Sequence, residues 1–276
     1  MTVLDKPAVL AGLFAVWRDL DELVGELEDS QWQTATSLPG WSVRDVIAHL
    51  IGVESMLQGV ETPDTDIDVS TLEHVRNDIG VMNERWVRSL RDLRAGELLD
   101  TFRETTADRR KALSDMSNAQ WNDVTFTPAG PDSYGRFMRV RIFDCWMHEH
   151  DIRDAIGAPA SAGELVGSAG DLALDEMAAS MGFVVGKLGG APDGSRVSLE
   201  LTGPLGRTIN VAVEGRAKLV DDFGDDEPTS TIQLDGLLFS RLAGGRTPLA
   251  QHADAITFGG DEAVGRRVVE HLNYVI

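Results

Sequence analysis

The pattern of apolar and polar positions divides the chain into two parts. Up to residue 156, apolar side chains recur every three or four positions, which is the spacing of one face of an α-helix. This spacing predicts helices over residues 7–28, 42–59, 70–116 (bent near Gly96) and 133–156. The stretch 121–133 is rich in proline and glycine and is expected to be a loop. Four amphipathic segments joined by loops predict a four-helix bundle.

Beyond residue 160 the pattern changes, because apolar residues alternate with polar ones in several short runs. Residues 196–201 and 208–213 show this period of two, and the glycines and proline of 203–206 predict a hairpin loop between them. Further strands are expected at 230–234 and 255–258, and helices at 164–188, 235–243 and 261–273. The second part is therefore expected to be an α+β domain with an antiparallel sheet.

The distribution of tryptophan and glycine supports this division. All six tryptophans precede residue 150, whereas 19 of the 28 glycines follow it. Glycine is unfavourable inside helices and common in turns between strands. The segment 157–163, rich in glycine and alanine, is the expected boundary, which gives a helical domain at 1–160 and an α+β domain at 161–276.

Composition and charge narrow the classes of function. The chain has 276 residues and a net charge of -20, which disfavours binding to nucleic acid or to an anionic membrane surface. It has one cysteine, Cys145, no run of 18 apolar residues, and no signal-peptide pattern at its N-terminus. We therefore expect a cytoplasmic protein that acts on small molecules. No feature of the sequence indicates an oligomeric state.

The strongest candidate for chemistry is a pair of residues in the fourth expected helix. Asp144 and His148 are four residues apart, so they share one helix face and lie one turn apart. A carboxylate and an imidazole at this spacing can bind one divalent metal ion, and His49 from the second helix could complete a set of three ligands. Three protein ligands leave a position open, as in catalytic zinc sites. Zn²⁺ is the expected metal, with Ni²⁺ and Mn²⁺ as alternatives.

A structural role fits the same residues. Asp144 and His148 could form a helix-surface hydrogen bond, since i,i+4 pairs of this kind are common. His49 lies among apolar positions, as a core histidine would. Cys145, three residues before His148, is a rival ligand, although a lone buried cysteine usually serves packing.

Residues 41–50 and 141–153 resemble the mycothiol-dependent maleylpyruvate isomerase family. In that family the N-terminal part is a DinB-like metal-binding four-helix bundle, and its two histidines and acidic ligand match His49, His148 and Asp144. The C-terminal segment is similar to the family's second domain, which is related to sterol-carrier-protein folds. We expect glutamate at the acidic position in this family, whereas this chain has Asp144, which is shorter by one methylene.

The resemblance also implies a chemistry. The family uses mycothiol, a small thiol of actinobacteria, whose sulfur would take the open metal position as thiolate and attack an electrophilic carbon of a small substrate. It favours an arginine of the second domain as a contact for a substrate carboxylate. Arg241 and Arg246 are the candidates, and we prefer Arg246 because it follows two glycines in a loop. Asp151 either orients His148 by a hydrogen bond or pairs with Arg153 or with a neighbouring helix.

The expected function is a mycothiol-dependent metalloenzyme that catalyses isomerisation or S-transfer. Two alternatives keep the same fold. One is a non-catalytic stress protein that binds metal or a small molecule, and the other is a hydrolase that uses metal-bound hydroxide. Turnover assays with and without a thiol distinguish these three functions.

Overall fold

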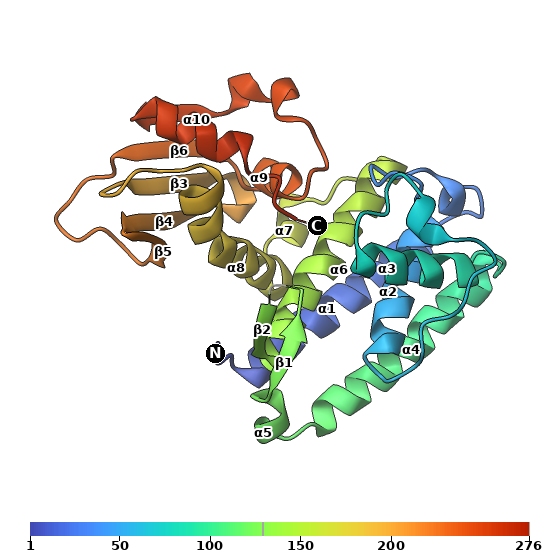
Figure 1. The fold of residues 1–276 in the computed structure, drawn as a ribbon. Helices are drawn as coiled ribbons and strands as arrows, with labels where there is room; N and C mark the ends of the chain where they lie inside the picture. Colours follow the sequence, from blue (N-terminus) through green and yellow to red (C-terminus); the bar gives the residue numbers. More distant parts are fainter. Residues whose placement is uncertain (129, 276) are drawn as a thin grey trace. The chain divides into compact units, whose positions relative to one another are not determined.

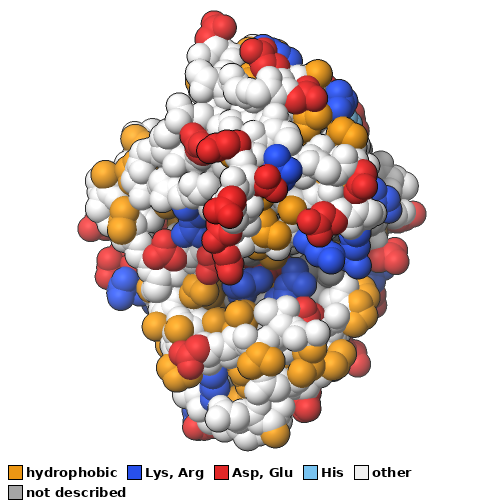
Figure 2. All heavy atoms as spheres, turned by 90° about the vertical axis from the view of Figure 1, so that its left-hand side faces the viewer, with side chains coloured by type: hydrophobic (Ala, Val, Ile, Leu, Met, Phe, Trp, Pro, Cys, Tyr) orange, Lys and Arg blue, Asp and Glu red, His pale blue; other side chains and the backbone are white. Residues whose placement is uncertain are grey.

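The computed structural model describes residues 1–128 and 130–275, and the chain divides into two compact units (Figure 1). The first unit is Met1–Ala160, and the second begins at Ser161. Acidic side chains are spread among apolar and basic ones over the face shown in Figure 2. Within the described part of the chain, no helix is long and apolar enough to cross a lipid bilayer.

The first unit is built on four long helices. These are α1 (Lys6–Gly25), α2 (Val43–Met56), α4 (Ala95–Asp115) and α6 (Tyr134–Ile156). Helices α1 and α2 each pack against both α4 and α6, which gives the expected four-helix bundle (Figure 1). Their apolar faces meet in a core whose fully buried side chains include Trp17, Leu50, Phe102 and Met138.

The single helix expected over 70–116 is two helices in the structure. Helix α3 spans Asp78–Ser89, and α4 follows it after a short break. The break lies before Gly96 because Arg94 caps α4, with its backbone N–H donating to the Glu97 carboxylate at 2.8 Å. Gly96 therefore lies in the first turn of α4 and marks no bend.

Helix α3 packs closely against α2. The approach depends on Gly52 of α2, because a Cβ at this position would lie 2.4 Å from Cγ of Trp86 on α3. Any larger residue at position 52 would push α3 away from the helix that carries His49.

Local caps fix the ends of the two helices that carry the candidate residues. At the start of α2, the backbone N–H of Ser42 donates to the Asp45 carboxylate at 2.9 Å, forming a capping box. At the start of α6, Ser133 Oγ accepts from the Arg136 N–H at 3.1 Å. Gly157 ends α6 with a φ of 67°, the left-handed conformation that favours glycine.

The stretch expected to be a loop before α6 contains regular structure. After the short helix α5 (Asn118–Trp121), strand β1 (Val124–Thr127) pairs antiparallel with β2 (Gly130–Ser133). Residue 129, within the expected loop, lies outside the described residues. The alternation of Val124 and Phe126 with threonines is a strand pattern, which the proline and glycine content of the stretch obscured.

The second unit contains a five-stranded sheet. Its strands are β3 (Arg196–Thr202), β4 (Arg207–Glu214), β5 (Arg216–Val220), β6 (Ser230–Asp235) and β7 (Thr257–Gly260). The strand order is β5-β4-β3-β6-β7, and neighbouring strands are antiparallel except β3 and β6, which are parallel. The expected α+β class is confirmed. The sequence did not predict β5, whose side chains are mostly exposed at the edge of the sheet, so it lacks a clear alternation.

Helices pack against this sheet within the second unit. They are α8 (Ser168–Phe183), α9 (Gly236–Ala243) and α10 (Glu262–Glu270), and the short helix α7 (Ala162–Leu165) precedes α8. Helix α8 packs against β4 and β5, and α10 packs against β6 and β7. The helix expected over 164–188 is interrupted between α7 and α8, and Val184–Leu188 form a π-helical turn after α8.

Candidate metal centre

His49 of α2 meets Asp144 and His148 of α6 inside the first unit. His49 Nε2 lies 3.2 Å from Asp144 Oδ2, and His148 Nε2 lies 3.6 Å from Asp144 Oδ1. One ligand atom from each residue lies within 4.8 Å of the other two. The packing of α2 against α6 therefore brings together the three residues singled out in the sequence.

The spacing of these atoms suits a divalent ion. Two ligand atoms at about 2.0–2.2 Å from a tetrahedral zinc ion lie about 3.3–3.6 Å apart. The two distances observed, each to a different oxygen of Asp144, are close to this range. Asp144 reaches both imidazoles at this spacing although it is shorter than glutamate. Two imidazole nitrogens and one carboxylate are also ligands that Zn²⁺ and other first-row metals prefer. The residues present thus fit a metal ion.

Asp151 orients one of the imidazoles. His148 Nδ1 lies 2.9 Å from Asp151 Oδ2, and Asp151 is buried. A proton on Nδ1, donated to this carboxylate, leaves the Nε2 lone pair directed at Asp144. A lone pair facing a carboxylate is favourable only when a proton or a cation lies between them. The contact with His148 that was expected for Asp151 is therefore present.

The protonation of the site also favours a cation. Burial lowers the pKa of His49 and outweighs the opposing effect of the Asp144 carboxylate, which raises it. Burial alone would raise the pKa of Asp144, but Arg141 and the two histidines hold it well below its ordinary value. At neutral pH, His49 is thus neutral and Asp144 ionised, the forms that bind metals. The side chain of Asp144 is 29% exposed, whereas those of His49 and His148 are 5% and 7% exposed, so solvent reaches the site beside Asp144.

Trp41 forms one wall of the site. Its ring centroid lies 5.2 Å from that of His49 and 6.3 Å from that of His148. The indole N–H donates to Glu84 Oε2 of α3 at 3.0 Å, and the other oxygen of this buried carboxylate accepts from Arg88 Nε at 2.9 Å. In the sequence, Trp41 was only part of the family motif, because its partner Glu84 lies 43 residues away and shares no spacing with it.

A buried chain of ion pairs leads from α4 to Asp144. Arg109 Nε of α4 donates to Glu54 Oε2 at 2.9 Å, and Arg141 Nε donates to Glu54 Oε1 at 2.9 Å. Arg141 Nη1 then donates to Asp144 Oδ2. Glu54 lies on α2, and its side chain is 0% exposed. The candidate ligand Asp144 is therefore supported from inside the bundle by an arginine that is itself held in place.

Cys145 is not part of the ligand cluster. Its side chain is buried, and burial raises the pKa of the thiol to about 12. A protonated thiol is a poor metal ligand and a poor nucleophile at neutral pH. The structure therefore favours the packing role for Cys145.

Arg241 and Arg246 belong to the second unit. Arg241 lies in α9, and Arg246 lies in the loop that follows it. The backbone N–H of Arg246 donates to the Arg241 carbonyl at 2.8 Å, and its Nη1 donates to the Gly244 carbonyl at 2.6 Å. The role of Arg246 as a contact for a substrate carboxylate stays a prediction.

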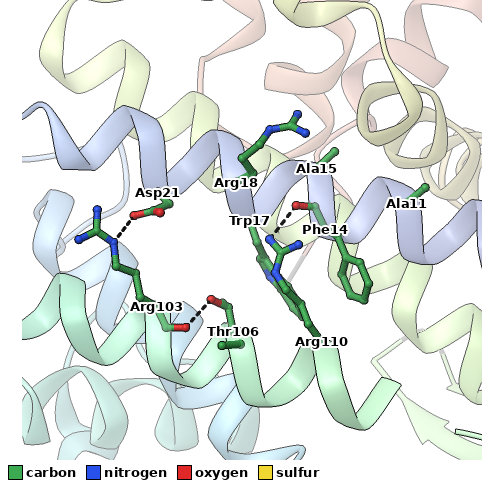
Figure 3. Close-up of a pocket in the computed structure, with 10 residues that line it drawn as sticks. Ala11, Phe14, Ala15, Trp17, Arg18, Asp21, Arg103, Thr106 and Arg110 are labelled. Atoms are coloured by element: carbon green, nitrogen blue, oxygen red, sulfur yellow. Dashed lines mark hydrogen bonds and ion pairs between the residues drawn. The ribbon is translucent and has the colours of Figure 1, made fainter. Parts of the chain in front are cut away.

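A separate groove of about 470 Å³ lies between α1 and α4 (Figure 3). Arg110 lies over the Phe14 ring at 4.9 Å and donates to the Phe14 carbonyl at 2.8 Å, while Arg103 Nε donates to Asp21 at 2.7 Å. These charged groups are engaged with the groove's own walls. None of the candidate metal ligands lines the groove, so it is not part of the site.

Two family models match most of the chain. The model of the mycothiol maleylpyruvate isomerase N-terminal domain matches residues 13–153, a range that contains His49, Asp144 and His148. The model of the C-terminal domain of the same family matches residues 171–267. The chain belongs to the mycothiol maleylpyruvate isomerase family. The resemblance seen in the sequence is thereby confirmed.

Solved structures and sequence relatives similar to this chain were also found. The crystal structure of a mycothiol-dependent maleylpyruvate isomerase has a TM-score of 0.58 at 20% identity, and a histidine-to-alanine mutant has 0.57 at 19%. In both comparisons the aligned part covers 94% of this chain and 96% of that chain, so the likeness extends to the whole fold. An uncharacterized protein from two strains of Mycobacterium tuberculosis is 25% identical over 225 residues, which is 80% of this chain and 83% of the relative.

Proposed function

We propose that this family member is a metal-dependent enzyme that uses mycothiol for isomerisation or S-transfer on a small electrophilic substrate. The observation that carries the proposal is the convergence of His49 Nε2, His148 Nε2 and the Asp144 carboxylate in one site. A bound divalent ion lowers the pKa of a coordinated thiol and so supplies a thiolate nucleophile near neutral pH. The buried Cys145 is not needed as nucleophile, because the reactive sulfur comes from the small thiol.

The residues of the chain have distinct roles in this proposal. His49, Asp144 and His148 would hold the ion, with Zn²⁺ expected and Ni²⁺ or Mn²⁺ as alternatives. Asp151 keeps His148 in the tautomer whose Nε2 can bind the ion. Trp41 excludes water from the side of the site that it covers. On the second unit, Arg246 would contact a carboxylate of the substrate.

Metal analysis combined with a thiol-dependence assay tests the proposal. Protein purified without chelators is expected to hold or rebind about one divalent ion per chain. Turnover of maleylpyruvate, or of an electrophilic conjugation substrate, should require mycothiol. Turnover that is unaffected by omitting the thiol would favour a hydrolase, and metal binding without turnover would favour a binding protein. Failure to hold or rebind any metal would rule out the mycothiol-dependent enzyme and the hydrolase, and would leave only a protein that binds a small molecule.

Replacing Asp151 with asparagine should weaken metal binding by about 10- to 100-fold, the usual effect of losing a partner that orients a ligand histidine. The neutral amide accepts the His148 N–H less strongly than the carboxylate does. Competition with a chromophoric zinc chelator measures the change. Ser37→Ala is the matched control, since its hydroxyl contacts the other Asp151 oxygen at 3.4 Å and its loss should have a smaller effect. Equal affinities of Asp151→Asn and the wild type would show that Asp151 does not support the ligand.

The lowered pKa of His49 predicts a pH dependence of stability in the metal-free protein. The unfolded chain takes up a proton at this residue near pH 6.5, whereas folded His49 does so only at lower pH. Protonation at His49 therefore favours the unfolded chain at low pH. The free energy of unfolding is not reduced by this effect above pH 6.5, and it falls as the pH drops below that value. Urea unfolding in EDTA at pH 7.5 and pH 5.5 measures it. The loss between the two should be smaller in His49→Gln, and an equal loss in both proteins would contradict the assignment.

A further inference from the structure

The buried ion pairs beside the candidate ligands balance one another. Glu54 and Asp144 supply two negative charges, and Arg109 and Arg141 supply two positive ones. The side chains of Glu54, Arg109 and Arg141 are at most 4% exposed, so water screens this group of charges weakly. Both arginines keep their charge under all ordinary conditions. The negative charge of Asp144 is therefore already matched before any metal ion is bound.

We propose that Arg141, by pairing with Asp144, leaves the metal-loaded site with an excess of positive charge and so makes it select an anionic ligand, a thiolate or a carboxylate. This inference rests on the proposed function, because it assumes that His49, Asp144 and His148 hold a divalent ion. It adds the charge class of the ligand and assigns a positioning residue that contacts no substrate.

The count of charges supports this selection. Two neutral imidazoles and a carboxylate matched by Arg141 contribute no net charge. Asp151, which contacts the far nitrogen of His148, contributes at most one negative charge. A divalent ion therefore keeps at least one net positive charge in a site shielded from water on most sides. Burying an unmatched charge is costly, so a monoanion from solution is favoured over a neutral ligand of the same size.

The contacts of Arg141 show why this arginine matches the negative charge of Asp144. Its Nε is held by Glu54 and its Nη2 lies 3.7 Å from Cys145 Sγ, so the guanidinium is fixed with Nη1 on Asp144. Arg109 shares the same Glu54, but its Nη2 donates to the Tyr134 hydroxyl and to Met138 Sδ rather than to a candidate ligand. The two arginines are thus alike in burial and differ in their contact with the ligand.

Cobalt-loaded protein provides a test that does not depend on turnover. Thiocyanate and thiourea, an anionic and a neutral sulfur ligand, are titrated while the visible spectrum of the cobalt ion is followed. The wild type should bind thiocyanate more tightly than thiourea. Arg141→Met should lower the affinity for thiocyanate by about tenfold, because one nearby positive charge is lost. Its affinity for thiourea should be unchanged, and it should bind cobalt no less tightly than the wild type. Arg141→Lys keeps the charge and should retain most of the affinity for thiocyanate.

Arg109→Met is the matched control for removing a buried arginine, and circular dichroism establishes that each variant is folded. Arg109→Met should lower the affinity for thiocyanate less than Arg141→Met does. Equal losses in the two variants, or a loss of cobalt affinity with thiocyanate unchanged, would overturn the inference. If Arg141→Met does not fold, the wild type still provides a test: equal affinities for thiourea and thiocyanate would overturn the inference. A wild type that binds no cobalt would instead contradict the proposed metal site.

Discussion

Replacing His148 with alanine should abolish stoichiometric metal binding. The change leaves His49 and Asp144, two ligands 3.2 Å apart, and removes one of three donors. The expected loss of affinity for Zn²⁺ is at least about 100-fold, at or above the upper end of the range for losing a supporting partner such as Asp151. Metal content after gel filtration, and titration against a zinc chelator, measure the loss. Thiol-dependent turnover should disappear with the metal.

The chain offers a control for this substitution in a histidine outside the site. His271→Ala also removes an imidazole, but this residue is exposed and its Nδ1 is engaged by the Arg267 carbonyl at 2.7 Å. It should keep the metal content of the wild type. His49→Ala should behave like His148→Ala, because both nitrogens face the same carboxylate. Retention of a full equivalent of metal in both ligand variants would contradict the proposed centre.

The parts of the site that the sequence predicted are those set by local rules. The four-residue spacing of Asp144 and His148 places them on one helix face whatever the rest of the chain does. The Ser42 cap and the apolar stripe of α2 likewise follow from neighbouring residues, and they placed His49 on a helix facing the bundle. The resemblance then connected the two helices, which spacing alone could not do.

The parts that the sequence did not predict depend on packing between distant segments. Trp41 and Glu84 are joined by a hydrogen bond across 43 residues, and Glu54 meets Arg141 across 87. Each of these charged residues looks like a solvated surface group when only its own helix is considered. Their burial becomes visible only once α2, α3, α4 and α6 are in contact. Sequence spacing carries no signal for such partners.

Glu54→Gln should be among the most destabilising single substitutions in the first unit. The carboxylate is fully buried and accepts from two arginines, each at 2.9 Å. A neutral amide leaves Arg109 and Arg141 as buried cations without a matching charge, and breaking a buried ion pair in this way costs about 3–5 kcal/mol. Urea unfolding at pH 7.5, followed by far-ultraviolet circular dichroism, measures the free energy of unfolding.

A matched surface pair shows why burial decides this cost. Glu22 also faces an arginine, Arg18 at 4.0 Å, but the two side chains are 72% and 61% exposed. Water replaces the lost partner there, so Glu22→Gln should change the free energy of unfolding only slightly. If Glu54→Gln unfolds at the same urea concentration as Glu22→Gln, the buried chain does not stabilise the bundle. A large loss for Glu54→Gln with little change for Glu22→Gln would show that the buried ion pairs, which also reach Asp144 through Arg141, stabilise the fold.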